Sequence, residues 1–337
     1  MFLDKIKHKF DLSLIKNIEL EDMAIDFTGP DDWTSTLSSD HMIAHISNIP
    51  GFSWPIQQIQ MRVIIRDNDI DLGRLDTPYS PARVSGGIIS TSFAHSTMSI
   101  YESSRMAFSE FLAALATKTH HTFTVKASTD IIFHLGLLGT HTIHSIDFVS
   151  DMTLRGLNNL PDIKCLSIKD VSFGHGGDGA GNAEGGADRG KEGEGVKRQE
   201  LFIKGMFDIQ NPSQLSLMLG DVTLGLAYTA KTAIDAGESG GSTERLPIGT
   251  LMLENLALLQ GLNDCRIGTI RLDLTLDGTK QFLKDVAQGP QTVHVHGFDG
   301  TSRNEALVGA LHGLATSFIM PTFAAPELVP PPKIEQQ

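Results

Sequence analysis

Apolar and polar residues alternate along most of the chain with a period of two, the pattern of strands that bury one face. Leu201, Ile203, Phe207 and Ile209 fall on one face of such a segment. Later alternating apolar positions are Leu215, Leu217, Leu219, Val222, Leu224, Leu226, Leu251, Leu253, Ile270, Leu272, Leu274, Leu276, Val293 and Val295. Turn signals recur often and helices do not interleave regularly with strands, which favours antiparallel sheets over a parallel one.

Three segments have helical periodicity instead, namely 103–118, 279–288 and 303–316. The second ends at Gly289-Pro290, a typical helix stop. In the first, the apolar positions are Met106, Phe108, Phe111, Leu112 and Leu115. The chain is therefore expected to be mainly β, with tandem antiparallel β-sandwich domains that each carry one or two short helices.

The best candidate for a membrane span is 306–326, which carries no formal charge. A spanning helix needs about 20 predominantly apolar residues, and this stretch is too mixed. A packed helix to about Phe318, followed by a strand, is the favoured interpretation, with Gly309 and Gly313 as a close-packing spot. The start of the chain, 1–22, has no apolar core of a secretory signal.

Composition divides the chain into segments. Residues 174–195 are rich in glycine and have no large apolar side chain, so we predict a flexible insertion over 174–198. A shorter polar loop is expected at 236–243, and 321–337 is expected to be an extended Pro-rich tail. These breaks predict a first β-sandwich repeat at 12–160 and a second at 161–320.

An internal similarity supports two diverged copies of one domain. Each half has a Phe-Leu pair in a helix, at 111–112 and at 282–283, then a short polar turn and a strand. The matching strands are 122–125 and 292–295, and a weaker echo pairs 18–27 with 166–173. Chance similarity between two amphipathic helix–strand units is the alternative.

Composition narrows the function. The 337 residues carry a net charge of −13, which argues against nucleic acid because phosphate neutralisation needs a Lys/Arg face. Apolar residues make up 40%, enough for real cores. Cys165 and Cys265 have no metal-ligand spacing, and whether the fold pairs them stays open.

Candidate chemistry is sparse. His294 and His296 share a strand face, and the other grouped histidines are His120, His121, His134, His141 and His144. None comes with HExxH, CxxC or a matched carboxylate pattern, so no metal site is predicted. The further motifs set aside are a serine-nucleophile loop at 238–241, a phosphate loop at Gly177, Gly179 and Gly181, and solvated carboxylates at Asp67, Asp69 and Asp71. No catalytic residue, metal or cofactor is predicted, and we expect a non-enzymatic protein.

Asn211-Pro212 lies between two alternating segments. Pro212 has no N–H and stops the ladder, while Asn211 can satisfy local backbone groups, so the pair predicts a corner between strands. The segment resembles the late-embryogenesis-abundant type two (WHy-like) domain. The residues that match that pattern are Leu201, Phe207, Ile209, Asn211, Pro212, Leu215 and Leu217. The stretch 246–295 resembles the rest of that fold.

Over about 15–320 the chain resembles a fungal family of unknown function that is sometimes labelled pre-rRNA processing protein. That family resembles the yeast vacuolar membrane protein implicated in terminating autophagy. Its closing pattern of a strand followed by Gly-Leu-Asn matches 154–160. The chain departs from the family because the first copy has no clear Asn-Pro corner and the usual upstream membrane helix is absent. The acidic charge gives the pre-rRNA label no support.

The resemblance implies a lipid- or apolar-ligand-binding module, the non-cytosolic part of a vacuolar membrane-associated protein that would reach the membrane through an upstream helix. A sandwich with an apolar groove could hold an acyl chain. The alternative is a protein-interaction or scaffold module that uses exposed sheet edges and no small ligand. The sequence names neither ligand-binding residues nor a protein partner.

Overall fold

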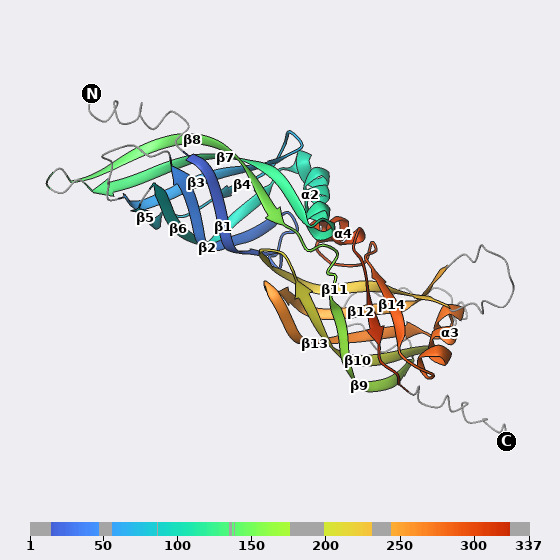
Figure 1. Cartoon of the computed structure of the whole chain (residues 1–337). Coiled ribbons are helices and arrows are strands. Elements are labelled where there is room, and N and C mark those ends of the chain that lie inside the picture. Colours follow the sequence, from blue (N-terminus) through green and yellow to red (C-terminus); the bar gives the residue numbers. More distant parts are fainter. Residues whose placement is uncertain are drawn as a thin grey trace, which may run out of the picture.

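The computed structural model describes residues 15–46, 56–85, 87–134, 137, 139–175, 199–230 and 244–323. The described chain is mainly β, which confirms the predicted fold class, and its sheets are of the sandwich type. Two units follow one another, the first above and the second below in Figure 1. Their cores form because alternate side chains of each strand turn inward.

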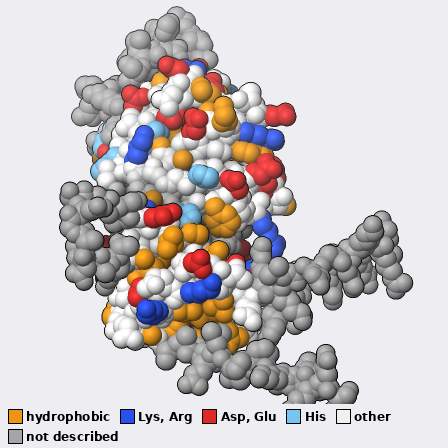
Figure 2. All heavy atoms as spheres, turned by 90° about the vertical axis from the view of Figure 1, so that its right-hand side faces the viewer, with side chains coloured by type: hydrophobic (Ala, Val, Ile, Leu, Met, Phe, Trp, Pro, Cys, Tyr) orange, Lys and Arg blue, Asp and Glu red, His pale blue; other side chains and the backbone are white. Residues whose placement is uncertain are grey.

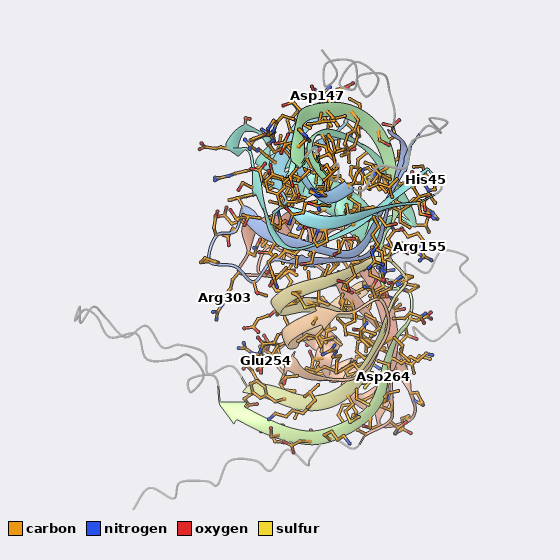
Figure 3. All side chains as sticks on the ribbon, turned by 90° about the vertical axis from the view of Figure 1, so that its left-hand side faces the viewer. His45, Asp147, Arg155, Glu254, Asp264 and Arg303 are labelled. Carbon is orange, nitrogen blue, oxygen red and sulfur yellow. The ribbon has the colours of Figure 1, made fainter. Side chains whose placement is uncertain are left out.

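The first unit runs from β1 to β8. Its elements are β1 (Ile15–Asp26), β2 (Thr34–Ile46), β3 (Ile56–Asp67), β4 (Ile70–Asp76), β5 (Ser80–Ser85), β6 (Ile88–Ile100), the short 3₁₀ helix η1 (Glu102–Ser104), α2 (Arg105–Thr117), β7 (His120–His134) and β8 (Thr140–Arg155). The strand order is β1-β2-β6-β4-β3-β7-β8, with β5 beside β3 and β6. Because β1 also lies against β8, the sheet curls back on itself and encloses its inward side chains (Figure 3).

The second unit runs from β9 to β15. Its elements are β9 (Ile163–His175), β10 (Gln199–Asn211), β11 (Leu215–Thr229), β12 (Arg245–Leu258), β13 (Gly261–Asp273), α3 (Asp277–Val286), β14 (Gln291–His296), α4 (Glu305–His312) and β15 (Ala315–Met320). The strand order is β9-β10-β13-β12-β11-β14-β15, and β15 lies against β9. This sheet therefore curls in the same way.

The two units share one topology. If β5 is set aside, each unit has seven main strands, which can be numbered one to seven along the chain. In both units these strands lie side by side in the order 1-2-5-4-3-6-7. The helix between the fifth and sixth strands is α2 in the first unit and α3 in the second. A duplicated domain would give this arrangement, with α4 as an insertion. The connection between the units is 156–162.

The two sheets are also joined into one. Met23–Asp26 of β1 pairs in parallel with Leu215–Met218 of β11. The sequence offers no sign of this pairing, because parallel partners far apart along the chain leave no turn signal between them. The β-sandwich units are thus in tandem along the chain but continuous in their hydrogen bonding.

Several predicted boundaries need correction. The helix expected at 303–316 ends at His312, since Gly313 follows as its C-cap and residues 315–320 pair with β14 as β15. Met106 is 78% exposed rather than buried, because it lies on the face of α2 opposite Phe111 and Leu115. Gly174, expected in the insertion, still pairs with Glu200 in β9–β10.

The remaining expectations for loops lie outside the described residues. They are the rest of the insertion at 176–198, the loop 236–243 with its 238–241 motif, the glycines at 177, 179 and 181, and the tail from 324.

The Asn211-Pro212 corner has the predicted role. β10 ends at Asn211 and β11 begins at Leu215. Asn211 is 1% exposed, and its Nδ2 donates to the carbonyls of Leu215 at 2.7 Å and Leu258 at 3.1 Å. Its Oδ1 accepts from the backbone N–H of Ser213 at 3.0 Å. One buried amide therefore satisfies three backbone groups that the turn leaves unpaired.

We predict that Asn211→Ala lowers the free energy of unfolding by about 2–4 kcal/mol, because the buried carbonyls and the N–H lose their partner. Urea denaturation measures the loss. The exposed neighbour Gln210 gives the control, since Gln210→Ala should stay within about 0.5 kcal/mol of the parent. Equal denaturation midpoints for the two variants would contradict the assigned role.

The two cysteines do not form a disulfide. Cys165 of β9 lies opposite Phe207 of β10, and Arg266 of β13 lies opposite Phe207 from the other side. β10 thus separates Cys165 from the exposed Cys265, and both thiols are free. Burial raises the pKa of the Cys165 thiol to about 11, with a smaller opposing effect from the backbone of Ser167.

We predict two very different rates of reaction with a thiol-exchange reagent at pH 8. Cys265 should react first because its side chain is exposed. Cys165 should react far more slowly, since a thiol with a pKa of about 11 is only about 0.1% thiolate at that pH. Cys265→Ser should leave only the slow phase, and a fast phase persisting in that variant would refute the prediction.

Candidate functional site

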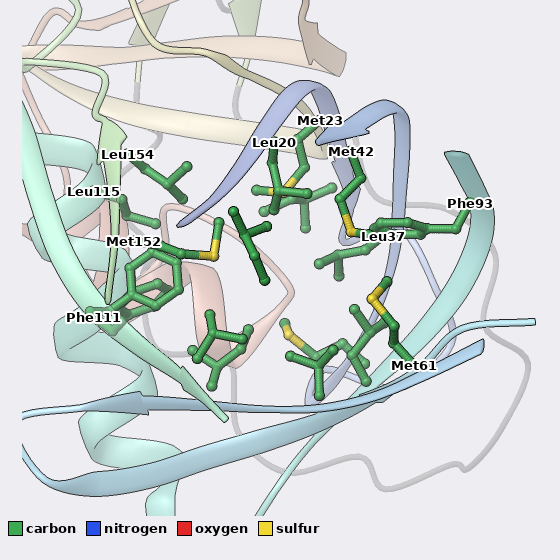
Figure 4. A pocket seen from close by; sticks show the side chains of 18 of the residues that line it. Leu20, Met23, Leu37, Met42, Met61, Phe93, Phe111, Leu115, Met152 and Leu154 are labelled. Atoms are coloured by element: carbon green, nitrogen blue, oxygen red, sulfur yellow. The ribbon is translucent and has the colours of Figure 1, made fainter. Parts of the chain in front are cut away.

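The first unit encloses an apolar cavity of about 70 Å³. Its wall is built from β1, β2, β3, β4, β6, β7, β8 and α2 (Figure 4). Every lining side chain is aliphatic, aromatic or methionine, so the space is dry in character. Because protein interiors contain few voids larger than a water molecule, this cavity is the candidate ligand site.

Strand alternation places the lining residues. On β8, Phe148, Met152 and Leu154 point into the cavity, whereas Val149 between them is 65% exposed on the outer face. On β3, Met61 and Val63 do the same. The curl of the sheet then turns all these inward faces toward one space.

Methionine and phenylalanine make up half of the wall. The methionines are Met23, Met42, Met61, Met98 and Met152, and the phenylalanines are Phe27, Phe93, Phe108, Phe111, Phe123 and Phe148. Methionine has three rotatable bonds and a polarisable sulfur, so it adapts to irregular gaps. Such a wall can change its shape around an occupant more easily than one of branched aliphatic side chains.

Helix α2 closes one end of the cavity. Its buried face presents Phe108, Phe111, Leu112 and Leu115 to the interior. Phe111 packs edge to face on Phe123, with 5.3 Å between the ring centroids. A helix across the mouth of a curled sheet thus completes the enclosure.

Helix α4 of the second unit packs on the helix that closes the cavity. α4 packs against α2, and a Cβ added at Gly309 would lie 2.8 Å from Cβ of Ser109, so Gly309 is the predicted close-packing spot. Asn304 caps α4 by accepting from the N–H of Leu307, and its Nδ2 donates to the carbonyl of Phe27 at 3.1 Å. Since Phe27 lines the cavity, the second unit supports its wall directly.

A polar pair lies at the α2 end. Asp67 Oδ1 and His121 Nε2 are 3.1 Å apart, and both side chains are nearly buried. The His121 ring rests against Phe111, 5.4 Å between centroids. The expectation of a solvated Asp67 was wrong, because the alternation of β3 turns it inward, whereas Asp69 is exposed as expected. Neither partner of the pair lines the cavity.

The second unit is packed more tightly. Its inward residues Leu201 and Ile203 are 0% exposed and Leu226 is 1%, while Ile25 and Val63 of the first unit keep 6% and 9%. In the second unit Tyr228 packs on Phe282, and its hydroxyl donates to Asp285 Oδ2 at 2.7 Å. Ile25 and Val63 are among the residues that line the cavity.

The grouped histidines do not converge. In the part of the chain that the structure describes, no three His, Cys, Asp or Glu side chains are close enough to hold a metal ion. His294 and His296 do share a strand face beside Arg245, and burial, with a further contribution from Arg245, lowers the pKa of both imidazoles. His144 binds Asp130 instead of another histidine, at 3.1 Å.

Sequence reasoning named no ligand-binding residue. Phe111 and Leu112 were predicted only as apolar helix positions and as part of the internal similarity, and they prove to line the end of the cavity that α2 closes. An apolar alternating strand looks the same whether its inner face meets a packed core or an empty space. The one available signal was the concentration of methionine at inward positions of the first half.

Comparisons with known proteins add no identity. No family model and no curated protein matches the chain. A solved structure titled "Enterococcal surface protein, partial N-terminal region" aligns over 92% of this chain and 95% of its own, at 9% identity and a TM-score of 0.16. That score carries no argument for a shared fold. Among the described residues, no helix is long and apolar enough to cross a membrane.

Proposed function

We propose that the chain is a non-enzymatic module that binds an apolar ligand in the cavity of its first unit. The observation that carries the proposal is the wholly apolar, enclosed space of about 70 Å³ behind α2. Small closed sheets of seven or eight strands are wide enough either to fill with side chains or to hold one small ligand. The unfilled apolar space in the first unit supports the second possibility.

An empty cavity lowers the stability of the fold. At about 24 cal/mol per Å³, a void of 70 Å³ costs on the order of 2 kcal/mol. In the second unit, which has the same topology, Leu201, Ile203 and Phe207 are packed to 0% exposure. A ligand that fills the space in the first unit would restore the lost contacts, which supports binding rather than a passive defect.

The family resemblance extends the proposal to a location on the non-cytosolic side of a vacuole-type membrane. A protease-protection assay on isolated vacuoles from cells that express the tagged chain tests this. The tag should resist protease until detergent opens the membrane. Digestion in intact vacuoles would place the module on the cytosolic side.

An interaction module without a small ligand remains the second candidate. It is favoured by apolar side chains on the outer face of the second unit, where Ile267 is 70% and Met252 is 38% exposed. Ile267 lies opposite Met206 across β13 and β10. On the side of the molecule that Figure 2 faces, apolar side chains also gather on the lower half. Such a face fits protein contact.

We predict that benzene binds the full chain and that Val63→Phe reduces its affinity at least about tenfold, because the larger ring fills the cavity. Isothermal titration calorimetry measures the affinity. Val149→Phe makes the same change on the exposed outer face of β8 and should leave binding unaltered.

Thermal unfolding checks that both variants fold. If Val63→Phe does not fold, Val125→Phe offers the same test from β7. If the parent chain binds neither benzene nor a six-carbon alcohol or acid, the ligand-binding proposal is refuted and the interaction module is favoured.

A further inference from the structure

Three buried hydroxyl groups of the first unit lack a hydrogen-bond partner. They are Ser35 Oγ, Ser96 Oγ and Thr129 Oγ1, and their residues are 4%, 2% and 1% exposed. Among the described residues, the other buried side-chain polar atom in this condition is Nε of Arg266. All the unpartnered hydroxyls thus belong to the unit that holds the cavity.

Such groups are unusual and unfavourable. The large majority of buried polar side chains have a partner, and a hydroxyl without one costs roughly 1–3 kcal/mol. Neighbouring polar residues of the same unit follow the rule, since Ser39 Oγ donates to the carbonyl of Glu21 at 2.9 Å and Thr91 Oγ1 donates to that of Pro81 at 2.9 Å. The three exceptions therefore call for a cause.

Strand register places all three on the inner face beside the cavity. Ser35 lies opposite Met98, and Ser96 lies opposite Leu37. Thr129 lies opposite Met61. Side chains opposite each other in an antiparallel pair point to the same face. Met98, Leu37 and Met61 all line the cavity, whereas the three hydroxyl residues lie next to this lining and are not part of it.

Ser35 and Ser96 form the closest set. They occupy diagonal positions on the neighbouring strands β2 and β6, since Ser35 is two residues from Leu37 and Ser96 is two residues from Met98. Diagonal side chains on one face of a sheet are about 7–8 Å apart, a gap that one polar group placed between them can bridge. Thr129 contributes a separate single hydroxyl from β7.

Charge limits what can enter. The lining contains no cationic side chain, so a carboxylate or phosphate inside would be buried without a counter-charge. The nearly buried carboxylates of this unit are engaged elsewhere, Asp67 with His121 and Asp130 with Arg62. A ligand with a neutral hydroxyl or carbonyl group meets no such penalty.

Size limits it further. One water molecule needs about 10–15 Å³ of cavity volume, and a non-hydrogen atom of a ligand needs about as much. A cavity of 70 Å³ therefore admits on the order of five to seven non-hydrogen atoms before its wall moves. The five methionines of the wall can make more room by changing rotamer. The cavity therefore fits a short hydrocarbon body or the end of a longer chain.

We propose that the ligand is an uncharged amphiphile, with a hydrocarbon body in the cavity and a hydroxyl or carbonyl group bound by Ser35 and Ser96 once the Met98 side chain, which lies beside both serines, changes rotamer. This inference rests on the proposed function and deepens it by naming the ligand class. The ligand's polar group takes the partnership that both serine hydroxyls lack, and Thr129 is a secondary contact for a second polar group.

Calorimetry with three probes on the full chain tests the inference. 1-Hexanol should bind at least about tenfold more tightly than hexanoate, which is ionised at pH 7.4. Ser35→Ala/Ser96→Ala should weaken 1-hexanol about five- to tenfold, the worth of a lost hydrogen bond, and should leave benzene binding unchanged. Thr129→Val should have a smaller effect on 1-hexanol.

Ser90→Ala/Ser92→Ala is the matched control, since both serines are exposed on β6, and it should bind all three probes like the parent. Thermal unfolding should show Ser35→Ala/Ser96→Ala folded and at least as stable as the parent without ligand, because two unpartnered hydroxyls are gone. Should it not fold, the comparison of 1-hexanol with hexanoate on the parent decides.

Two outcomes overturn the inference while the proposed function stands: benzene binds but hexanoate binds as tightly as 1-hexanol, or the serine variant binds 1-hexanol like the parent. If the parent chain binds none of the three probes, the proposed function itself fails.

Discussion

The pairing of β1 with β11 is the interaction on which the rest of the molecule depends. β1 has β2 on one edge along its whole length, while its other edge lies against β8 and then pairs with β11 at Met23–Asp26. Met23, Ile25 and Phe27 in and next to that pairing segment line the cavity. The same short segment therefore joins the two units and forms a wall of the candidate site.

The shared topology gives a comparison within one molecule. The same strand order and the same helix position produce a tightly filled interior around Phe207 and Tyr228, and a cavity lined by methionines behind Phe111. The backbone arrangement does not impose the cavity. It results from the side chains that the first unit places on its inward positions.

Local patterns in the sequence predicted the local structure well. Alternation predicted the strands, the Phe-Leu pairs lie in α2 and α3, and Asn211-Pro212 forms its corner because Asn211 satisfies the turn within a few residues. Errors arose where a distant partner decides the outcome. Residues 315–320 form β15 because β14 offers them an edge, and the β1–β11 pairing joins residues almost two hundred positions apart along the chain.

The candidate site could not be predicted from the sequence, because it too depends on residues that are far apart along the chain. The size of a cavity is the volume that a curled sheet encloses minus the volume that its side chains fill. The hydrophobic pattern of the sequence predicts neither volume. What the sequence does carry is a polar residue at an inward strand position, as at Ser35 and Thr129. Such a residue interrupts the apolar alternation of its strand. Whether it contacts a ligand or only the core depends on the residues opposite it in the sheet.

The contact of Asn304 with Phe27 has a consequence for the energetics of the whole chain. Asn304 begins α4, and α4 packs on α2, so losing the second unit would remove support from both β1 and α2. The two units are therefore expected to unfold in one cooperative transition rather than two. By thermodynamic linkage, a ligand bound only in the first unit would then protect backbone amides of the second from hydrogen exchange.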